Sequence, residues 1–217
     1  MTELQSAVWV SITVSLSATA LCALAGLPAG CLLALRDFAG KRAVLALLNT
    51  LLALPTVVVG LVGYLLLCRR GPLGPLHLLF TPGAIVFGEF ILALPIMVVF
   101  AHAAVAGVDR AARDTARTLG AGPAALAWTL LSEARFGILA AVAATFGRLV
   151  GEVGIAMMLG GNISGYTRTM TTAIALEASK GQAGPALQLG GVLLAIAVAV
   201  NVVLRVLQGQ AGSEAAA

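Results

Sequence analysis

Residues 83–106 read GAIVFGEFILALPIMVVFAHAAVA, and this stretch decides the fold class of the chain. It contains one charged residue, Glu89. A helix needs about 20 predominantly apolar residues to cross the hydrocarbon core of a bilayer. The stretch therefore predicts a membrane-spanning helix, and it sets the pattern to look for in the rest of the chain.

The composition of all 217 residues agrees with that prediction, because 60% of them are hydrophobic and only 10% are charged. Soluble domains carry about 25% charged residues. A soluble fold of this length would still expose roughly 30% of the surface of its unfolded chain, and so many apolar side chains could not avoid water. The composition excludes a soluble domain and predicts an all-α integral membrane protein.

Five stretches have the length and composition of membrane spans, so we expect about five transmembrane helices in one domain over residues 1–207. The spans are expected at about 8–35, 43–68, 83–106, 136–159 and 184–207. The apolar stretch 170–178 is too short to cross a bilayer, and we interpret it as a sixth, half-length or re-entrant helix. The polar tail 208–217 is expected to be disordered.

The distribution of basic residues predicts the orientation. With the N-terminus outside and five spans, eight of the 13 Lys and Arg side chains lie inside and four outside. Short cytoplasmic loops carry an excess of Lys and Arg. We therefore expect the C-terminus in the cytoplasm, with the pair Arg69–Arg70 as the main exception outside.

The connection at 107–135 differs from the other loops because it has its own helical pattern. Asp109–Leu119 is rich in Ala and charged residues, Gly120 and Gly122 interrupt it, and Pro123 suits the first turn of a second helix. Two short helices joined by a glycine elbow could transmit movement from a separate motor protein. A solvated amphipathic connector is the alternative interpretation.

Within this loop, DTARTLGAG at 114–122 resembles the cytoplasmic loop of ATP-binding-cassette (ABC) importer permeases, Glu-Ala-Ala, three residues, Gly. The chain differs from the usual form at Asp114 and Thr115. The resemblance implies that this loop contacts an ATPase. The residues assigned to this coupling role are Asp114, Thr115, Ala116, Leu119, Gly120, Ala121 and Leu126.

Two further stretches narrow the resemblance. LALPTVVVGLVGYLLL at 52–67 is similar to the second span of molybdate permeases, and GRLVGEVGIAMMLGGNISGYTRTMTTAIALE at 147–177 resembles the tungstate/molybdate branch. The sequence SEAR at 132–135 favours tungstate permeases. The resemblance implies a type I importer fold in a bacterial inner membrane, importing tungstate or molybdate.

The same resemblance implies partners. They are a second copy of the chain, two ATP-binding subunits on the cytoplasmic side, and an external oxyanion-binding protein. ATP and Mg²⁺ would bind the ATPase subunits, because this chain has no Gly-rich loop followed by Lys and Ser/Thr. We expect no cofactor, metal, nucleic acid or catalytic residue in this chain.

Three charges fall inside predicted spans, at Glu89, Arg148 and Glu152. A charge at the bilayer centre costs about 2.5–3.5 kcal/mol on insertion scales, so such side chains face the bundle interior. Arg148 and Glu152 are four residues apart and share a helix face, which favours a mutual ion pair. A gate or pathway role is the alternative, with Arg148 as a hypothetical partner of Glu89.

The external segment 160–172 is polar, and its amide, hydroxyl and guanidinium groups are those that bind oxyanions. The candidates for an oxyanion pathway are Asn162, Thr167, Arg168 and Thr169. The favoured interpretation is a polar outer loop that docks the binding protein or closes the helix bundle without contacting the substrate, because an importer must not hold its cargo tightly.

Two other function classes remain open from the sequence. A secondary transporter or channel would use Glu89, Arg148 and Glu152 as an ion relay. A membrane scaffold protein would transport nothing. Neither class of protein would need the loop at 107–135. Co-purification of an ATPase subunit would distinguish an importer from both classes.

Overall fold

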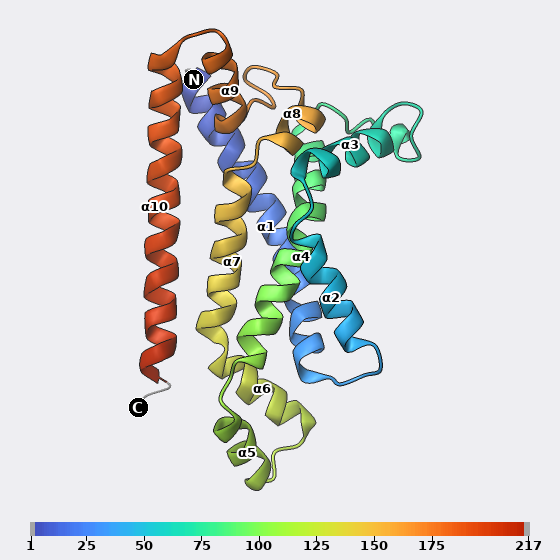
Figure 1. Ribbon diagram of the computed structural model, residues 1–217, viewed down its shortest axis with the longest axis vertical. Coiled ribbons are helices and arrows are strands. Elements are labelled where there is room, and N and C mark those ends of the chain that lie inside the picture. Colours follow the sequence, from blue (N-terminus) through green and yellow to red (C-terminus); the bar gives the residue numbers. More distant parts are fainter. Residues whose placement is uncertain (1–2, 215–217) are drawn as a thin grey trace. The chain divides into compact units, whose positions relative to one another are not determined.

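The computed structural model describes residues 3–214, and all regular elements in that range are helices (Figure 1). The elements are α1 (Glu3–Leu35), α2 (Lys41–Leu51), α3 (Thr56–Leu67), the short 3₁₀ helix η1 (Gly74–Leu76), α4 (Pro82–Ala106), α5 (Arg110–Thr118), α6 (Pro123–Glu133), α7 (Arg135–Val150), α8 (Gly154–Gly160), α9 (Met170–Ser179) and α10 (Ala183–Glu214). The predicted all-α class is confirmed.

Three helices are individually long and apolar enough to cross a membrane: Glu3–Leu35, Pro82–Ala106 and Ala183–Val206. The number rises to five if two bent helix pairs, α2 with α3 and α6 with α7, each count as one span. Helix α9 has 10 residues, as the short stretch 170–178 predicted. The disorder expected for the tail 208–217 is not observed as far as Glu214, because α10 continues to that residue. Residues 215–217 lie outside the described residues.

The second predicted span, 43–68, is not one straight helix. Helices α2 and α3 meet at an angle of 96°. The break ends at Pro55, whose ring fixes its backbone and whose missing N–H cannot continue the bonding of α2. Its φ of −63° and ψ of 126° are extended, and its carbonyl accepts from the N–H groups of Val58 and Val59 at 3.0 and 3.2 Å. Pro55 therefore ends one helix and begins the next.

The fourth predicted span, 136–159, is also interrupted. Helix α7 ends at Val150, and α8 begins at Gly154 after a short non-helical link. In the link, the Glu152 carboxylate accepts from the Gly154 N–H at 2.9 Å, and the Glu152 carbonyl accepts from the Thr171 hydroxyl at 2.6 Å. Side chains thus satisfy backbone groups that a continuous helix would satisfy itself, as a membrane interior requires.

The contacts divide the described chain into two units, each with its own core. Unit 1 contains the described residues up to Leu21, with Ala53–Ala93 and Phe146–Ala199; unit 2 contains Cys22–Leu52, Leu94–Thr145 and the described residues from Val200 onward. Helices α1, α4, α7 and α10 contribute to both.

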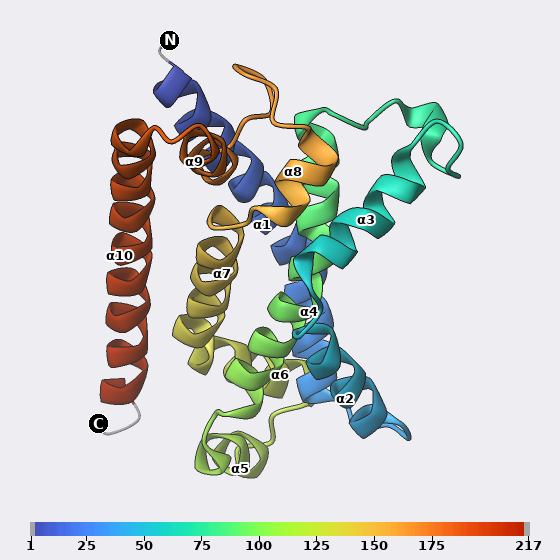
Figure 2. The same cartoon turned by 45° about the horizontal axis from the view of Figure 1, so that its top comes forward.

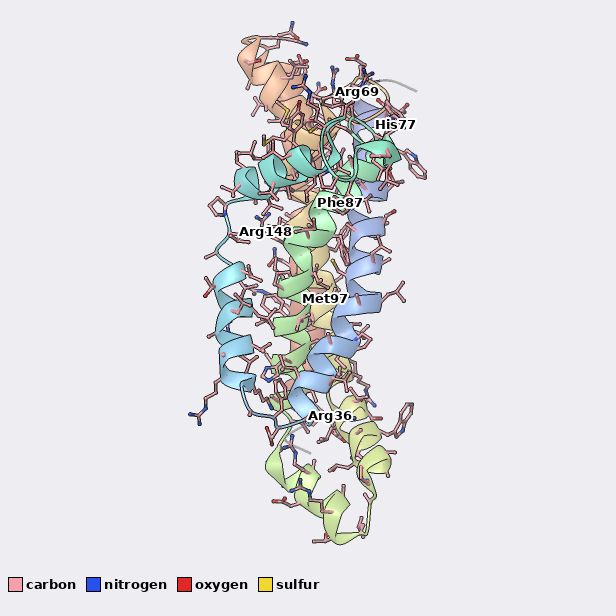
Figure 3. The ribbon with its side chains drawn as sticks, turned by 90° about the vertical axis from the view of Figure 1, so that its right-hand side faces the viewer. Arg36, Arg69, His77, Phe87, Met97 and Arg148 are labelled. Atoms are coloured by element: carbon pink, nitrogen blue, oxygen red, sulfur yellow. The ribbon has the colours of Figure 1, made fainter. Side chains whose placement is uncertain are left out.

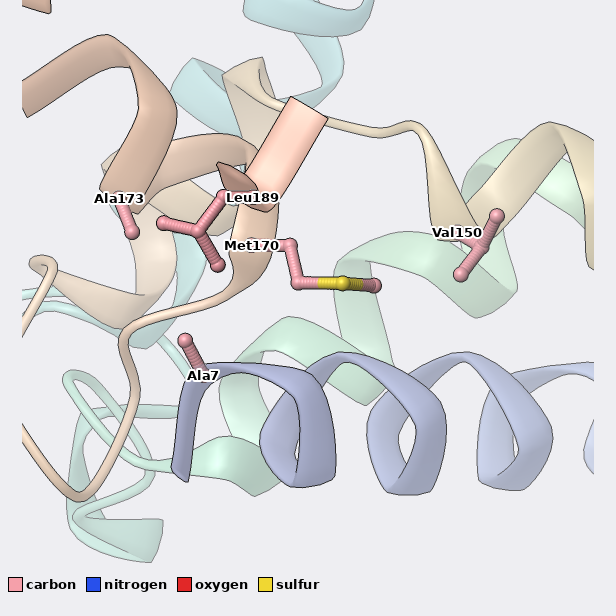
Figure 4. Packing of buried hydrophobic residues seen from close by; sticks show 5 residues of the cluster. All are labelled: Ala7, Val150, Met170, Ala173 and Leu189. Atoms are coloured by element: carbon pink, nitrogen blue, oxygen red, sulfur yellow. The ribbon is translucent and has the colours of Figure 1, made fainter. Parts of the chain in front are cut away.

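One core cluster of unit 1 joins four helices (Figure 4). Its buried members are Ala7 of α1, Val150 of α7, Met170 and Ala173 of α9, and Leu189 of α10. The amide of Met170 also donates to the buried hydroxyl of Ser11 at 2.7 Å. Helix α9 is therefore fixed to α1 by a hydrogen bond as well as by packing.

Helices α3 and α8 lie side by side in unit 1 (Figure 2). Glycines permit this approach: a Cβ on Gly60 would lie 3.1 Å from the sulfur of Met158, and one on Gly88 of α4 would lie 2.6 Å from side-chain atoms of Ile155 and Leu159. Small residues at such contacts let membrane helices approach closely. The short α8 is thereby held against both α3 and α4.

Candidate functional site

The loop predicted to couple to an ATPase forms a hairpin of α5 and α6 in unit 2, and the two helices contact each other. Asp109 precedes α5, and its carboxylate accepts from the Ala111 N–H at 3.0 Å. This N-cap satisfies a backbone group that the first turn leaves unpaired. The short helices predicted in this loop are confirmed, with α5 ending at Thr118 and α6 starting at Pro123.

The elbow between them is a Schellman motif. The Ala121 N–H donates to the Ala116 carbonyl, and the Gly120 N–H donates to the Arg117 carbonyl, both at 3.0 Å. Gly120 has a φ of +81°, the left-handed conformation that this motif requires and that glycine adopts without strain. The elbow thus has one defined geometry.

The base of the hairpin is anchored in the core of unit 2. Leu130 and Ala134 are buried against Val105 of α4, and Leu126 packs on the same cluster. Residues of α1, including Cys31 and others near its end, complete the cluster. The base of the hairpin is therefore packed against both α1 and α4.

The outer surface of the hairpin, in contrast, exposes large apolar side chains. Leu119, at the elbow, is 82% exposed, and Trp128, midway along α6, is 74% exposed. Asp114 and Thr115 are also exposed, whereas Ala116 is buried. Exposed apolar side chains with polar neighbours mark a surface that another protein covers. Of the residues assigned to coupling, the structure thus places some on the outer surface and others, such as Leu126, in the support beneath it.

Arg148 and Glu152 form the ion pair that their spacing predicts. An Arg148 guanidinium nitrogen lies 2.9 Å from Oε2 of Glu152. The other oxygen, Oε1, accepts from the N–H groups of Gly154 and Ile155 at 2.9 and 3.4 Å. Glu152 is 4% exposed. The carboxylate therefore caps the N-terminus of α8 and neutralises Arg148 at the same time.

Glu89 has no such pairing, although Arg148 and Glu152 are its charged neighbours. It is 2% exposed, and its Oε2 has no hydrogen-bond partner among the described residues. Among the described residues, Glu89 and Arg148 do not form the hypothetical ion pair, because Arg148 is bound to Glu152. The three charges share one region of unit 1 without forming a continuous chain of bonds.

The threonines proposed for an oxyanion pathway are buried and already bonded. The Thr167 hydroxyl donates to the Gly160 carbonyl at 2.6 Å and accepts from the Ile163 N–H at 3.0 Å. Thr169 and Thr172 cap the start of α9 reciprocally. These hydroxyls hold the loop and the helix start together, which agrees with the favoured interpretation of a closing loop.

Arg168 also has partners within unit 1. Its Nε donates to the Asn162 side-chain oxygen at 3.2 Å, and a terminal nitrogen lies 3.5 Å from a carboxylate oxygen of Glu3. Glu3 accepts in addition from the Ser164 hydroxyl at 2.6 Å. The structure therefore brings Asn162 and Arg168 together, and it ties both to the start of α1.

A comparison with protein families decides the assignment. The family model described as "Binding-protein-dependent transport system inner membrane component" matches residues 26–210, a range that includes the hairpin and the three intramembrane charges. The chain belongs to this family. The permease is accordingly a multi-pass membrane protein, and ATP hydrolysis belongs to partner subunits.

Curated relatives of the permease are similar over most of its length. The probable anion ABC transporter permease of Haloferax volcanii is 43% identical over 93% of this chain and 89% of its own length. The tungstate permease TupB of Campylobacter jejuni is 41% identical over 76% and 69%. The molybdenum permease ModB of Escherichia coli is 31% identical over 82% and 84%.

A solved structure confirms the predicted fold of the permease. A chain of the MetNI methionine ABC transporter, in inward-facing conformations, superposes with a TM-score of 0.71 at 17% identity. The match covers 94% of the permease and 95% of that chain. At this identity the likeness concerns the fold alone.

Sequence reasoning missed several residues that organise the permease. The structural role of Thr171, whose hydroxyl binds the Glu152 carbonyl, was not predicted. The link from Glu3 to Arg168 was also missed, because it joins residues far apart in the chain. Thr169 before the apolar stretch 170–176 is an N-cap signal that could have been recognised. The contacts across helices have no comparable local signal.

Proposed function

We propose that the permease is the membrane subunit of an ATP-driven importer for tungstate, with molybdate as a second cargo. The observation that carries the proposal is the family match over 26–210. The relative named for tungstate shares 41% identity and the one named for molybdenum 31%, which supports the choice of cargo. The same match favours ATP-driven import over an ion relay or a scaffold.

In this mechanism the α5–α6 hairpin receives the movement of the ATPase. The exposed Leu119 and Trp128 lie on the surface that the ATPase would cover, and the buried base carries the displacement to α1 and α4. A defined elbow suits this task, because a flexible loop would absorb the movement instead of transmitting it. ATP and Mg²⁺ bind the ATPase.

The complete importer is proposed to contain two copies of the permease and two ATPase subunits, together with an external oxyanion-binding protein. The family description names dependence on a binding protein. The proposed location is a bacterial inner membrane, with the start of α1 outside and the end of α10 in the cytoplasm. The excess of basic residues on the cytoplasmic side supports this orientation.

We further propose that the segment around Thr167 and Thr169 supports the external end of the permease without binding the oxyanion. The hydroxyls are engaged in internal hydrogen bonds. Arg148 and Glu152 are proposed to hold α7 and α8 together through their ion pair and the hydrogen bonds of Glu152, whereas Glu89 makes no such bond. Only a rearrangement of these bonds would free them for cargo.

A reconstituted complex tests the cargo directly. The permease, its ATPase and the binding protein are assembled in liposomes, and ATP hydrolysis is measured with the binding protein loaded with tungstate, molybdate or sulfate. Tungstate and molybdate should stimulate hydrolysis, and sulfate should not. Failure of the permease to co-purify with an ATPase, or equal stimulation by sulfate, would overturn the proposal.

A further inference from the structure

The loop between α3 and α4 encloses a pocket of about 580 Å³ in unit 1. Figure 3 shows Arg69 and His77 close together on this loop, and both line the pocket. The residues of the lining that bear on its chemistry are Tyr64, Leu67, Arg69, Arg70, His77 and Phe80. The pocket therefore combines basic and apolar side chains.

The backbone around the pocket is closely folded. The Leu73 N–H donates to the Leu66 carbonyl at 2.9 Å, and a Cβ on Gly71 would overlap that same carbonyl. At the other end of the loop, the Phe80 N–H donates to the Leu159 carbonyl of α8 at 2.8 Å. These bonds hold the backbone of the loop that carries Arg69 and Arg70.

The charge of this pocket is not balanced within the described chain. Four basic residues lie on the side predicted to be outside, and two of them have carboxylate partners: Arg168 lies 3.5 Å from Glu3, and Lys180 lies 2.8 Å from Glu177. Arg69 and Arg70 are exposed and form no ion pair among the described residues. Two adjacent unpaired guanidinium groups attract an anionic partner.

The size of the pocket indicates what kind of anion it receives. Pockets of about 300–1,000 Å³ enclose drug-sized molecules, whereas a tetrahedral oxyanion fills only a small part of such a volume. Leu67, which is 2% exposed, and Phe80, which is 43% exposed, line the pocket together with the basic side chains. Arginine and aromatic side chains are enriched at protein–protein contacts.

The position of the pocket along the chain indicates which side the partner comes from. The loop precedes α4 and the α5–α6 hairpin follows it, so the two lie at opposite ends of a 25-residue helix. Such a helix is about 37 Å long, enough to cross the bilayer core. If the hairpin faces the ATPase, the pocket faces the external compartment.

We propose that this pocket, lined by Arg69, Arg70 and His77 together with Leu67 and Phe80, is a docking site for a carboxylate-bearing segment of the external binding protein. The inference rests on the proposed function, because it takes the binding protein as the partner. The two arginines orient the approaching protein by its negative charge. The exposed apolar side chain of Phe80 then contacts the side chains next to the carboxylates.

The test uses the complete transporter in nanodiscs and a fluorescently labelled, tungstate-loaded binding protein. In the double variant R69Q/R70Q, the dissociation constant should rise about tenfold at low salt, and its dependence on salt should become weaker. The variant R69K/R70K keeps both charges and should retain most of the affinity. Lys180→Gln is the matched control, because Lys180 is already paired with Glu177, and it should leave the affinity unchanged.

The outcomes separate this inference from the proposed function. If tungstate-loaded binding protein does not stimulate the wild-type transporter, the proposed function fails. If it does and R69Q/R70Q binds as tightly as wild type, only the docking site is overturned. Loss of the two-copy assembly in R69Q/R70Q, measured by light scattering, would assign the pocket to a contact between copies. Loss of tungstate binding without the binding protein would assign it to the free oxyanion. Either result replaces our proposal.

Discussion

At Glu152 one carboxylate performs two tasks with its two oxygens. Oε2 binds Arg148 and Oε1 accepts from the N–H groups that open α8. A bilayer interior offers no water to replace either partner. A carboxylate is the side chain of this length that can neutralise an arginine and accept from backbone groups at once.

Replacing Glu152 by Gln should separate the two tasks. The amide oxygen can still accept from the Gly154 N–H, but the charge that neutralises Arg148 is lost. We expect a loss of stability of about 1–3 kcal/mol, measured as a lower apparent melting temperature of the permease in detergent. Glu152→Ala removes both tasks and should be less stable than Glu152→Gln.

Glu177→Gln is the control for this comparison. It removes the ion pair with Lys180, whose side chain is 47% exposed, and exposed pairs contribute about 0–1 kcal/mol. Equal losses for Glu152→Gln and Glu177→Gln would contradict the special role of Glu152.

Glu89 leads to the opposite prediction. Its buried Oε2 has no hydrogen-bond partner among the described residues, and burying an unpaired polar or charged group costs free energy. Glu89→Gln keeps the shape without the charge, so the variant should melt at the same temperature as wild type or higher. A clearly lower melting temperature would mean that Glu89 has an ionic partner in the assembled transporter.

The contrast between these two glutamates indicates what a sequence can predict at this scale. Arg148 and Glu152 are on one helical segment, so their spacing of four was sufficient to predict their ion pair. Glu89 is on another helix, and its partner depends on how α4 packs against α7 and α8. That packing depends on side chains distant in sequence, so the proposed pairing of Glu89 with Arg148 was wrong.

At the scale of elements, the elbow of the α5–α6 hairpin contains two glycines that have similar free space but different backbone conformations. Gly120 has a φ of +81°, whereas Gly122 has an ordinary φ of −67°, and a Cβ on either would meet no atom within 4 Å. Any effect of a side chain at Gly120 therefore arises from the backbone conformation, which costs an L-residue roughly 1–2 kcal/mol.

We expect Gly120→Val to distort the elbow and to reduce ATP hydrolysis stimulated by the loaded binding protein. Gly122→Ala should remain close to wild type. The measurement is the stimulated rate in liposomes, with the amount of bound ATPase subunit determined for each variant. Wild-type stimulation in Gly120→Val would remove the elbow from the coupling mechanism.

The helices of the hairpin were predictable, but the breaks in two spans were not. Gly120 and Pro123 are local signals that act on the nearest few residues, and each had its expected effect. The segments 43–68 and 136–159 are apolar on both sides of their breaks, so composition gives a continuous helix. Pro55 is a local signal that can end a helix, but the 96° bend depends on the contact of α3 with α8.

At the scale of the whole molecule, the proposed mechanism requires the hairpin and the basic pocket to face opposite compartments. One continuous helix, α4, separates them along the chain. A measurement of which compartment the hairpin faces and which the pocket faces therefore tests the coupling proposal and the docking proposal together.

Cysteine labelling answers this question. In a variant with Cys22, Cys31 and Cys68 replaced by Ala, a cysteine is introduced at Leu119, which is 82% exposed on the hairpin, or at Leu76, which is 59% exposed near the pocket. A membrane-impermeant maleimide should label Leu76→Cys in intact cells and Leu119→Cys only in inverted vesicles.

Binding of the ATPase supplies the control, since it should protect Leu119→Cys in the inverted vesicles and leave the labelling of Leu76→Cys in intact cells unchanged. Labelling of both positions from one face would contradict α4 as a membrane span. Exchanged sides would place the hairpin outside, where no ATPase can reach it, and both the coupling mechanism and the docking site would then be wrong. Protection of Leu119→Cys would in addition identify its exposed apolar neighbourhood as the surface that the ATPase covers.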